Sequence, residues 1–159
     1  MVPIDRTHAR LSTLAGSCLC GEVSFEVSGP FPKLYQCHCS LCRKQSGSVS
    51  NTGLIVAAAK FRWLAGEARI GQWERSTGFR SHFCLTCGST VPNMLRDTGY
   101  VWVPAGALDK DVPLEIGAQL FLASKMRGDR PRTDGLQYET APGLRELIAI
   151  LHGEQRAQP

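Results

Sequence analysis

The amino-acid sequence predicts a mainly β, antiparallel fold with two zinc sites and a helix near the C-terminus. Short segments that alternate apolar and polar residues, separated by glycines, indicate the strands. One amphipathic segment close to the C-terminus indicates the helix. All seven cysteines fall into three tight clusters, a spacing typical of zinc ligands.

A single domain accounts for the length and composition of the chain. Its 159 residues are 43% hydrophobic and 20% charged, values at which one ordinary domain buries a core. We expect this zinc-binding domain to occupy residues 16–153, with an N-terminal extension at 1–15 and a frayed tail at 154–159.

The cytoplasm is the expected location. No segment approaches the roughly 20 apolar residues that cross a bilayer, and the N-terminus lacks the apolar stretch of a secretion signal. A reducing compartment disfavours disulfides, so metal binding or redox chemistry better explains the cysteines. The net charge of +4 favours small anionic ligands, but it is dispersed, so nucleic acid is not an expected partner.

The strands are predicted from apolar–polar alternation. The first covers residues 22–28, where Val23, Phe25 and Val27 would share one buried face before Gly29-Pro30 ends the strand. Further strands are expected at residues 52–58, 61–64, 69–73, 78–83, 100–103 and 118–122.

The helix near the C-terminus is predicted over residues 142–151, packed on the sheet, and Gly153 is placed to end it. Its apolar residues recur at helical spacing: Leu144, Leu147, Ile148 and Leu151. The preceding segment, 126–138, is rich in Arg, Gly, Pro and Asp and is expected to be a mobile, solvated loop.

A second, short helix is expected to begin at Leu41, with Ser40 as its N-cap. Cys42 would then lie where backbone N–H groups point. Such a position favours the thiolate form of a cysteine.

The cysteines form three clusters: Cys18-Leu19-Cys20, Cys37-His38-Cys39-Ser40-Leu41-Cys42 and Cys84-Leu85-Thr86-Cys87. A C-x-C or C-x-x-C turn lets two thiolates reach one tetrahedral zinc ion. The middle cluster can fill three corners of a tetrahedron by itself, which would leave one position open for water or substrate. The two outer clusters then provide the four thiolates of a closed, structural site.

Other divisions of the cysteines stay open at this point. One is a single four-cysteine site built from the middle cluster and one outer cluster. Another is a redox pair, either Cys39 with Cys42 or Cys84 with Cys87, although the βαβ context of such pairs is missing. Thiolates would also suit an iron–sulfur cluster.

His38 lies between two of the proposed ligands. Because the side chains of its neighbours turn toward the metal, we expect the imidazole to point away from it. A role in positioning the ligands or contacting the substrate is therefore expected for His38, rather than metal binding.

Four motifs together resemble the glutathione-dependent formaldehyde-activating enzyme family, which includes centromere protein V. They are GSCLCGEV at 16–23, CHCSLCRKQSG at 37–47, FRWLAGE at 61–67 and FCLTCGS at 83–89. GALDKD at 106–111 and Ala123-Ser124-Lys125 match more weakly. The resemblance extends from residue 16 to residue 125.

The resemblance implies a tent-like, β-rich fold of the Mss4-like type with two zinc ions. It implies a structural zinc on Cys18, Cys20, Cys84 and Cys87, and a second zinc, near the substrate, on Cys37, Cys39 and Cys42. The family adds formaldehyde to glutathione, which gives S-hydroxymethylglutathione, and its members are classed as carbon–sulfur lyases.

The sequence departs from the family pattern at two places. Members commonly carry a histidine shortly after the Gly-x-Leu-Asp element, where this chain has Leu114-Glu115-Ile116. They also follow Ser-Lys with an aromatic-containing segment, where this chain has Met126-Arg127-Gly128. We therefore expect the substrate pocket to differ from that of the family.

The leading hypothesis is a zinc-dependent enzyme of the carbon–sulfur lyase class that acts on glutathione or a related thiol and a small aldehyde. An open zinc with three thiolates is a weak Lewis acid, so delivery of a substrate thiolate is its better use. Arg43, Lys44 and Lys125 are the candidates for binding the carboxylates of the thiol. The alternative is a non-catalytic, zinc-stabilised module that binds a thiol or a protein.

Overall fold

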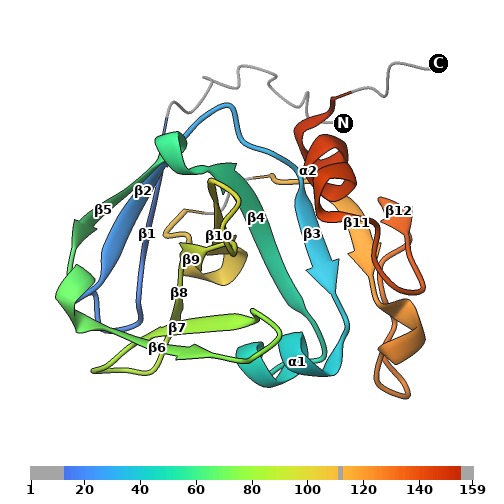
Figure 1. Ribbon diagram of the computed structural model, residues 1–159, viewed down its shortest axis with the longest axis horizontal. Coiled ribbons are helices and arrows are strands. Elements are labelled where there is room, and N and C mark those ends of the chain that lie inside the picture. Colours follow the sequence, from blue (N-terminus) through green and yellow to red (C-terminus); the bar gives the residue numbers. More distant parts are fainter. Residues whose placement is uncertain (1–12, 111–112, 155–159) are drawn as a thin grey trace, which may run out of the picture.

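The computed structural model describes residues 13–110 and 113–154 and arranges them as three β-sheets with two α-helices. Figure 1 shows the sheets as the sides of a tent, with the short helix α1 (Ser40–Ser46) at its base and the C-terminal helix α2 (Leu144–His152) against one side. The predicted mainly β fold with a C-terminal helix is confirmed.

The first sheet is antiparallel and has the order β1–β2–β5, with β1 at Thr13–Ser17, β2 at Ser24–Ser28 and β5 at Phe61–Ala65. Phe25 of β2 is fully buried and packs against the rings of Phe61 and Trp63, with ring centroids 5.7 Å and 6.1 Å away. Gly16 lies against the same ring: a Cβ at this position would lie 2.2 Å from Phe25 Cζ, so only glycine fits without rearrangement.

The second sheet has six strands in the order β12–β11–β3–β4–β10–β9. Their bounds are β3 Leu34–Cys37, β4 Asn51–Ala57, β9 Asn93–Met94, β10 Tyr100–Pro104, β11 Ile116–Leu120 and β12 Leu136–Gln137. β11 runs parallel to β3 and to β12, and the other pairs are antiparallel. The sheet is thus mostly antiparallel, as predicted. Its edge formed by β3, β11 and β12 is parallel, which the alternation of apolar and polar residues could not reveal.

The third sheet is antiparallel and small, with the order β6–β7–β8. β6 covers Ile70–Glu74, β7 Arg80–Cys84 and β8 Thr90–Val91. Four 3-10 turns complete the described secondary structure: η1 Ala58–Lys60, η2 Glu67–Arg69, η3 Ala105–Ala107 and η4 Leu122–Ser124.

The seven predicted strands are all present, displaced by at most two residues at each end. The C-terminal helix is also confirmed: Gly153 ends it in the left-handed conformation, with φ of 70°, and Leu147 and Leu151 are buried. β1 begins at Thr13, inside the segment predicted as an extension; the rest of that segment, 1–12, lies outside the described residues, as does 155–159 of the predicted tail.

The prediction of a mobile loop at 126–138 is wrong for two of its parts. Leu136–Gln137 pairs with β11 as strand β12, and the side chain of Asp129 is only 7% exposed. Composition indicates solvation on average, but it does not reveal a single buried carboxylate. Within the described residues, no helix is long and apolar enough to cross a membrane.

Candidate metal centre

The seven cysteines gather into two groups, and the division is four and three. The four outer thiols lie within 4.8 Å of one another, and so do the three of the middle cluster. Two measured distances in the outer group are 3.5 Å between Cys18 and Cys20 and 3.8 Å between Cys20 and Cys84. Zinc–thiolate bonds of about 2.3 Å in a tetrahedron place sulfurs about 3.8 Å apart, so the group fits one zinc ion.

Ser89 connects the two turns that carry the four outer cysteines. Its hydroxyl oxygen accepts a hydrogen bond from the N–H of Leu19 at 3.0 Å and lies 3.2 Å from the sulfur of Cys87. The interaction with the Ser89 side chain, followed by that with its backbone N–H, lowers the pKa of Cys87 to about 5. This turn is therefore arranged to hold a thiolate.

A set of polar contacts braces the same two turns from outside. Arg69 forms an ion pair with Glu22 at 3.0 Å and donates a hydrogen bond to the Thr86 hydroxyl at 3.1 Å. Thr86 in turn donates to the carboxylate of Glu22. Because Glu22 follows the first turn and Thr86 lies within the second, the contacts support a structural role for the four-thiol group.

The three middle thiols come from the end of β3 and the start of α1. Cys37 is the last residue of the strand, Cys39 is the N-cap of the helix, and Cys42 lies in the first turn. The prediction that Ser40 caps this helix is wrong, because the sulfur of Cys39 accepts the N–H of Cys42 at 3.5 Å. The cap and one candidate metal ligand are thus the same atom.

The three middle thiols cannot all ionise easily without a cation. Hydrogen bonds from Cys37 and Cys42 lower the pKa of Cys39 to about 2. The hydrogen bond with Cys39 raises the pKa of Cys37 to about 12, and hydrogen bonds with Cys37 and Cys39 raise the pKa of Cys42. A bound divalent cation would stabilise all three thiolates together, so the donor set fits a metal ion.

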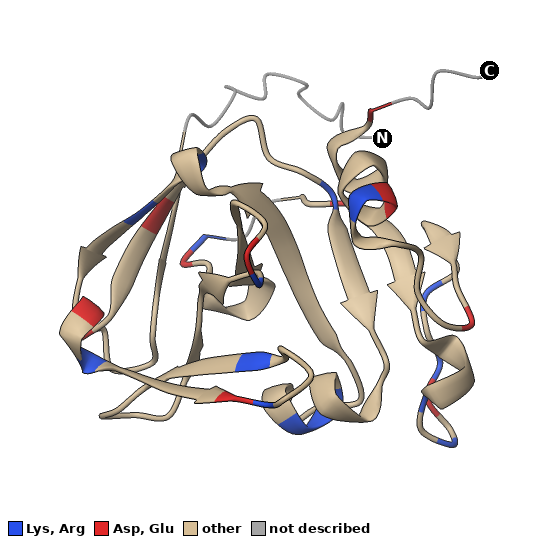
Figure 2. Cartoon of the chain, in the orientation of Figure 1, with Lys and Arg blue, Asp and Glu red and all other residues tan. Residues whose placement is uncertain are grey.

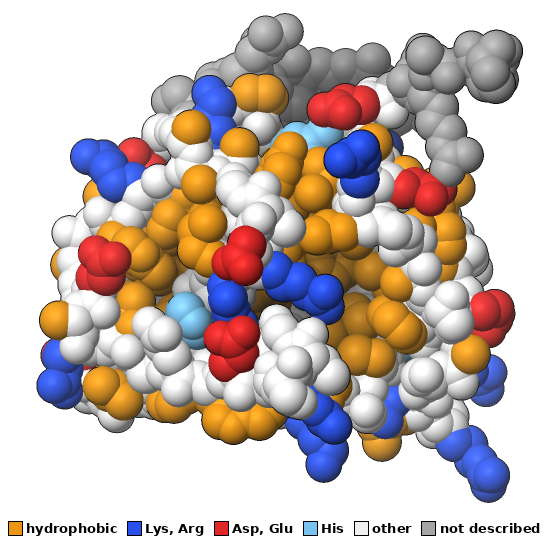
Figure 3. Space-filling view, viewed as in Figure 1, with side chains coloured by type: hydrophobic (Ala, Val, Ile, Leu, Met, Phe, Trp, Pro, Cys, Tyr) orange, Lys and Arg blue, Asp and Glu red, His pale blue; other side chains and the backbone are white. Residues whose placement is uncertain are grey.

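All three middle thiols line a cavity of about 460 Å³. Its walls come from β3, β4, β10, β11, α1, α2 and the loops beside β7 and β9. Figure 3 shows it as a hollow floored by hydrophobic side chains and bordered by a basic one. The group of three therefore has open space beside it, as a site with a free coordination position requires.

Two residues in the cavity wall have strained backbones. Arg96 and Phe121 have φ of 51° and 58°, and they are the only described residues other than glycine with positive φ. Non-glycine residues held in this region cost about 1–3 kcal/mol each and cluster at functional sites. Their presence in one wall supports the cavity as the candidate site.

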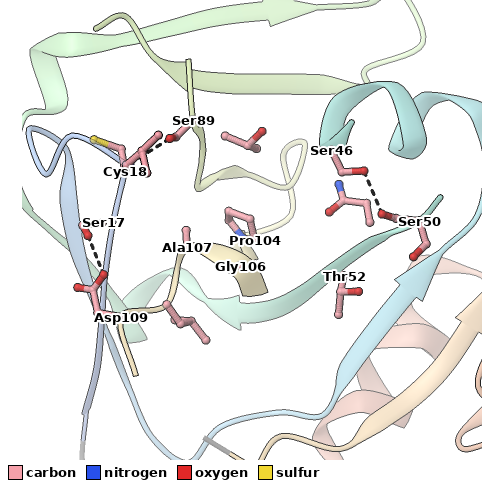
Figure 4. Close-up of a pocket in the computed structure, with 14 residues that line it drawn as sticks. Ser17, Cys18, Ser46, Ser50, Thr52, Ser89, Pro104, Gly106, Ala107 and Asp109 are labelled. Carbon is pink, nitrogen blue, oxygen red and sulfur yellow. Dashed lines mark hydrogen bonds between the residues drawn. The ribbon is translucent and has the colours of Figure 1, made fainter. Parts of the chain in front are cut away.

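A second cavity, of about 680 Å³, has Ser46 at the end of α1 in its lining and none of the three middle thiols. Several serine and threonine residues line it, and Figure 4 shows Ser17 directed toward Asp109, which accepts its hydrogen bond at 2.6 Å. Although this cavity is larger, it has no open group of metal ligands. The smaller cavity is therefore the better candidate for chemistry.

His38 points away from the middle thiols, into the protein. Its side chain is 1% exposed, with Nδ1 2.8 Å from the carboxylate of Asp129 and Nε2 2.9 Å from the amide oxygen of Gln119. His38 does not line the cavity. The imidazole thus ties the 126–138 segment and β11 to the chain between two candidate metal ligands, which favours the positioning role over substrate contact.

We expect removal of this tie to destabilise the fold. Asp129→Ala leaves Nδ1 of a buried histidine without its partner, which should lower the free energy of unfolding by about 1–3 kcal/mol. Urea unfolding of the metal-loaded protein measures the effect. Asp134→Ala, at an exposed aspartate of the same segment, should change stability little; equal losses for both variants would contradict the role given to His38.

The predicted carboxylate-binding cations lie outside the cavity. Arg43 donates hydrogen bonds to the backbone oxygens of His38, at 3.0 Å, and of Ser124. Lys44 and Lys125 are exposed, and neither lines the cavity. Lys and Arg residues are distributed over several of the described elements, and Figure 2 shows no large patch of them on the drawn chain.

The positions at which the chain departs from the family pattern also lie away from the cavity. Glu115 pairs with Lys33 at 3.1 Å, and both side chains are at least half exposed. Met126 is 47% exposed and does not line the cavity either.

Sequence reasoning missed the residues that surround the middle thiols. Among them are two arginines, Arg80 and Arg96, and the aromatic side chains of Tyr35, Trp102 and Phe121. Burial, and then the nearby thiols, raise the pKa of Tyr35 well above its usual value. These residues come from separate strands and loops, so no local spacing could group them.

Residues 13–124 match the sequence model of a family described as glutathione-dependent formaldehyde-activating enzyme. A Halomonas elongata protein, whose name proposes it as such an enzyme, is 33% identical over 116 residues, which cover 63% of this chain and 68% of that protein. A crystal structure of a Rhodobacter sphaeroides protein has a TM-score of 0.53 at 24% identity and covers 62% of this chain and 91% of that one, a likeness of fold alone.

Proposed function

Because this chain belongs to the glutathione-dependent formaldehyde-activating enzyme family, we propose that it joins a thiol to a small aldehyde at its three-thiol site. The observation that carries the proposal is the position of Cys37, Cys39 and Cys42 together in the wall of one open cavity. Glutathione and formaldehyde, which the family name specifies, are the reference substrates. The reducing cytoplasm is the compartment in which we expect the thiols to stay free for metal.

We propose two zinc ions, one on each group of cysteines. Cys18, Cys20, Cys84 and Cys87 would hold a structural ion, and Cys37, Cys39 and Cys42 the second. When bound to the three thiols, zinc supplies a free coordination position and lowers the pKa of a substrate thiol there.

The reaction itself needs little from the protein beyond positioning. The sulfur of the thiol forms a bond to the carbonyl carbon, the C=O π bond breaks, and the thiol proton ends on the oxygen. The reverse reaction cleaves the carbon–sulfur bond, which agrees with a lyase class. The cavity walls would hold the two reactants together and keep bulk water out.

Charge near the cavity would guide an anionic thiol. Arg96 lies in the wall and is proposed to attract a carboxylate directly, whereas Arg80 lies in the same wall already paired with Glu74 and Asp97. Lys44 and Lys125 would act from outside, by steering, and Arg43 would hold the η4 turn against α1 through the backbone of Ser124.

Metal analysis and rate measurements test this function. Purified protein should contain two zinc ions by elemental analysis, and a mild chelator should remove one of them first. The zinc-loaded protein should form S-hydroxymethylglutathione faster than the spontaneous reaction does. Binding of glutathione without acceleration would instead indicate a thiol-binding module, and iron with visible absorption would indicate a different cofactor.

A further inference from the structure

The cavity beside the three thiols is apolar over most of its wall. Its hydrophobic residues include Phe79, Trp102, Leu120, Phe121, Leu144 and Leu147. Trp102, Leu120 and Leu147 are each less than 7% exposed, so their positions are fixed by packing in the core. A volume of about 460 Å³ is far more than formaldehyde needs, so the cavity has room for the body of the other reactant.

Apart from the three cysteines, the charged residues in the wall are all of one sign. Arg80 and Arg96 line the cavity, and no Asp or Glu does among the described residues. Glutathione carries an ammonium group and two carboxylates joined by a polar backbone. The ammonium group would find no carboxylate among the described wall residues, and burying a charge without an ionic partner is costly.

The two arginines differ in their availability. Arg80 already forms ion pairs with Glu74 at 3.2 Å and Asp97 at 3.8 Å, and it donates a hydrogen bond to the backbone oxygen of Arg96 at 3.4 Å. The Arg96 side chain has no hydrogen bond or ion pair with another described residue. Arg80 therefore positions the loop, and the guanidinium of Arg96 is available for a ligand.

The loop that carries Arg96 is held in place. The N–H of Leu95 donates to the oxygen of Tyr100 at 2.8 Å, and the hydroxyl of Thr98 donates to the oxygen of Leu95 at 2.5 Å. The positive φ of Arg96 is maintained by this closed turn. Because the backbone of the turn is already ordered, binding a carboxylate would fix only the side chain of Arg96.

We propose that the cavity selects thiols with an apolar body and a single carboxylate, in preference to glutathione. The sulfur would lie at Cys37, Cys39 and Cys42, the apolar body against the hydrophobic wall, and the carboxylate on Arg96. The sulfur position rests on the proposed function. The positions of the apolar body and of the carboxylate are argued from the lining of the cavity and do not depend on the proposed function.

Calorimetric titration of the zinc-loaded full-length protein tests the proposal with three matched probes and glutathione. The probes are 4-(mercaptomethyl)benzoate, 4-methylbenzyl mercaptan, which lacks the carboxylate, and 4-methylbenzoate, which lacks the sulfur. We expect 4-(mercaptomethyl)benzoate to bind more tightly than glutathione by about tenfold or more, since both the ring and the carboxylate contribute. Tighter binding of glutathione would overturn the proposal and leave the proposed function intact.

Substitution of Arg96 separates the contribution of the carboxylate to the affinity from the contribution of the aromatic ring. Arg96→Gln should weaken 4-(mercaptomethyl)benzoate about tenfold and leave 4-methylbenzyl mercaptan unchanged. Arg75→Gln removes an exposed cation from the neighbouring β6–β7 turn, outside the cavity wall, and should leave both affinities unchanged. If both variants weaken the binding of 4-(mercaptomethyl)benzoate equally, the effect comes from the net charge of the protein, and a specific role for Arg96 is contradicted.

The probe without sulfur distinguishes failure of the proposed thiol site from failure of the proposed selectivity of the cavity. If 4-methylbenzoate binds in an Arg96-dependent manner but the sulfur adds no affinity, the proposed thiol site fails and the selectivity of the cavity stands. If 4-methylbenzoate and both thiols fail to bind, the cavity proposal fails.

Discussion

Replacement of Cys84 by serine is expected to unfold the protein. Cys84 is 1% exposed and contributes to the group of four thiols, which joins residues 64 positions apart in sequence. Structural zinc sites contribute about 10–16 kcal/mol in finger peptides, whereas a whole domain has a net stability of about 5–15 kcal/mol. A serine hydroxyl is a poor replacement for the thiolate, so the loss should exceed what the core can offset.

Circular dichroism and zinc content of the Cys84→Ser protein measure this effect. Thr86→Ser is the matched control, because it alters the same turn but keeps the hydroxyl that bonds to Glu22 and Arg69. The control should fold like the unchanged protein. A Cys84→Ser protein with a normal unfolding midpoint would show that the four-thiol group does not hold the sheets together.

Replacement of Cys39 by serine should abolish activity and leave the fold intact. Cys39 is both a candidate metal ligand and the N-cap of α1. Serine is among the best N-cap residues, so the helix should be retained, while the metal loses one of three thiolates. We expect the zinc content to fall from two ions to one and the rate of adduct formation to fall to the spontaneous rate.

Comparison with Cys39→Ala separates the two roles of this residue. Alanine removes the cap as well as the ligand, so it should lower stability below that of Cys39→Ser by about 1 kcal/mol. Both variants should be inactive to the same degree. A Cys39→Ser protein that is unfolded would mean that the group of three is also structural, and one that is fully active would place the chemistry elsewhere.

The two variants have opposite expected consequences because the two groups of cysteines sit differently. The turns at 18–20 and 84–87 belong to different sheets, and they are joined through the bonds from Leu19 to Ser89 and from Thr86 to Glu22. The middle group comes from one continuous segment at the base of the tent and faces a cavity (Figure 1). Loss of the first group separates sheets, whereas loss of the second leaves an empty site on a fold that has other support.

The strands and the metal groups could be predicted because their signals are local. Val23, Phe25 and Val27 alternate along one strand, and a short spacing between cysteines limits which sulfurs can share an ion. Contacts between residues far apart in the chain leave no comparable local pattern in the sequence. β3 was missed because the segment 34–37 has no alternation, and its place inside the sheet follows only from its pairing with β4 and β11.

The amino-acid sequence predicts a β-rich domain and favours a division of the cysteines into four and three, because both signals lie within a few residues, and the structure then brings the sulfurs together in those two groups. Only the tertiary structure decided what lies beside the open group. Arg96, Trp102 and Leu147 meet there from a loop, a strand and the C-terminal helix, and His38 turns inward to Asp129. The character of the cavity, apolar with one free cation among its described residues, follows from packing between segments far apart in the chain, which local patterns do not encode.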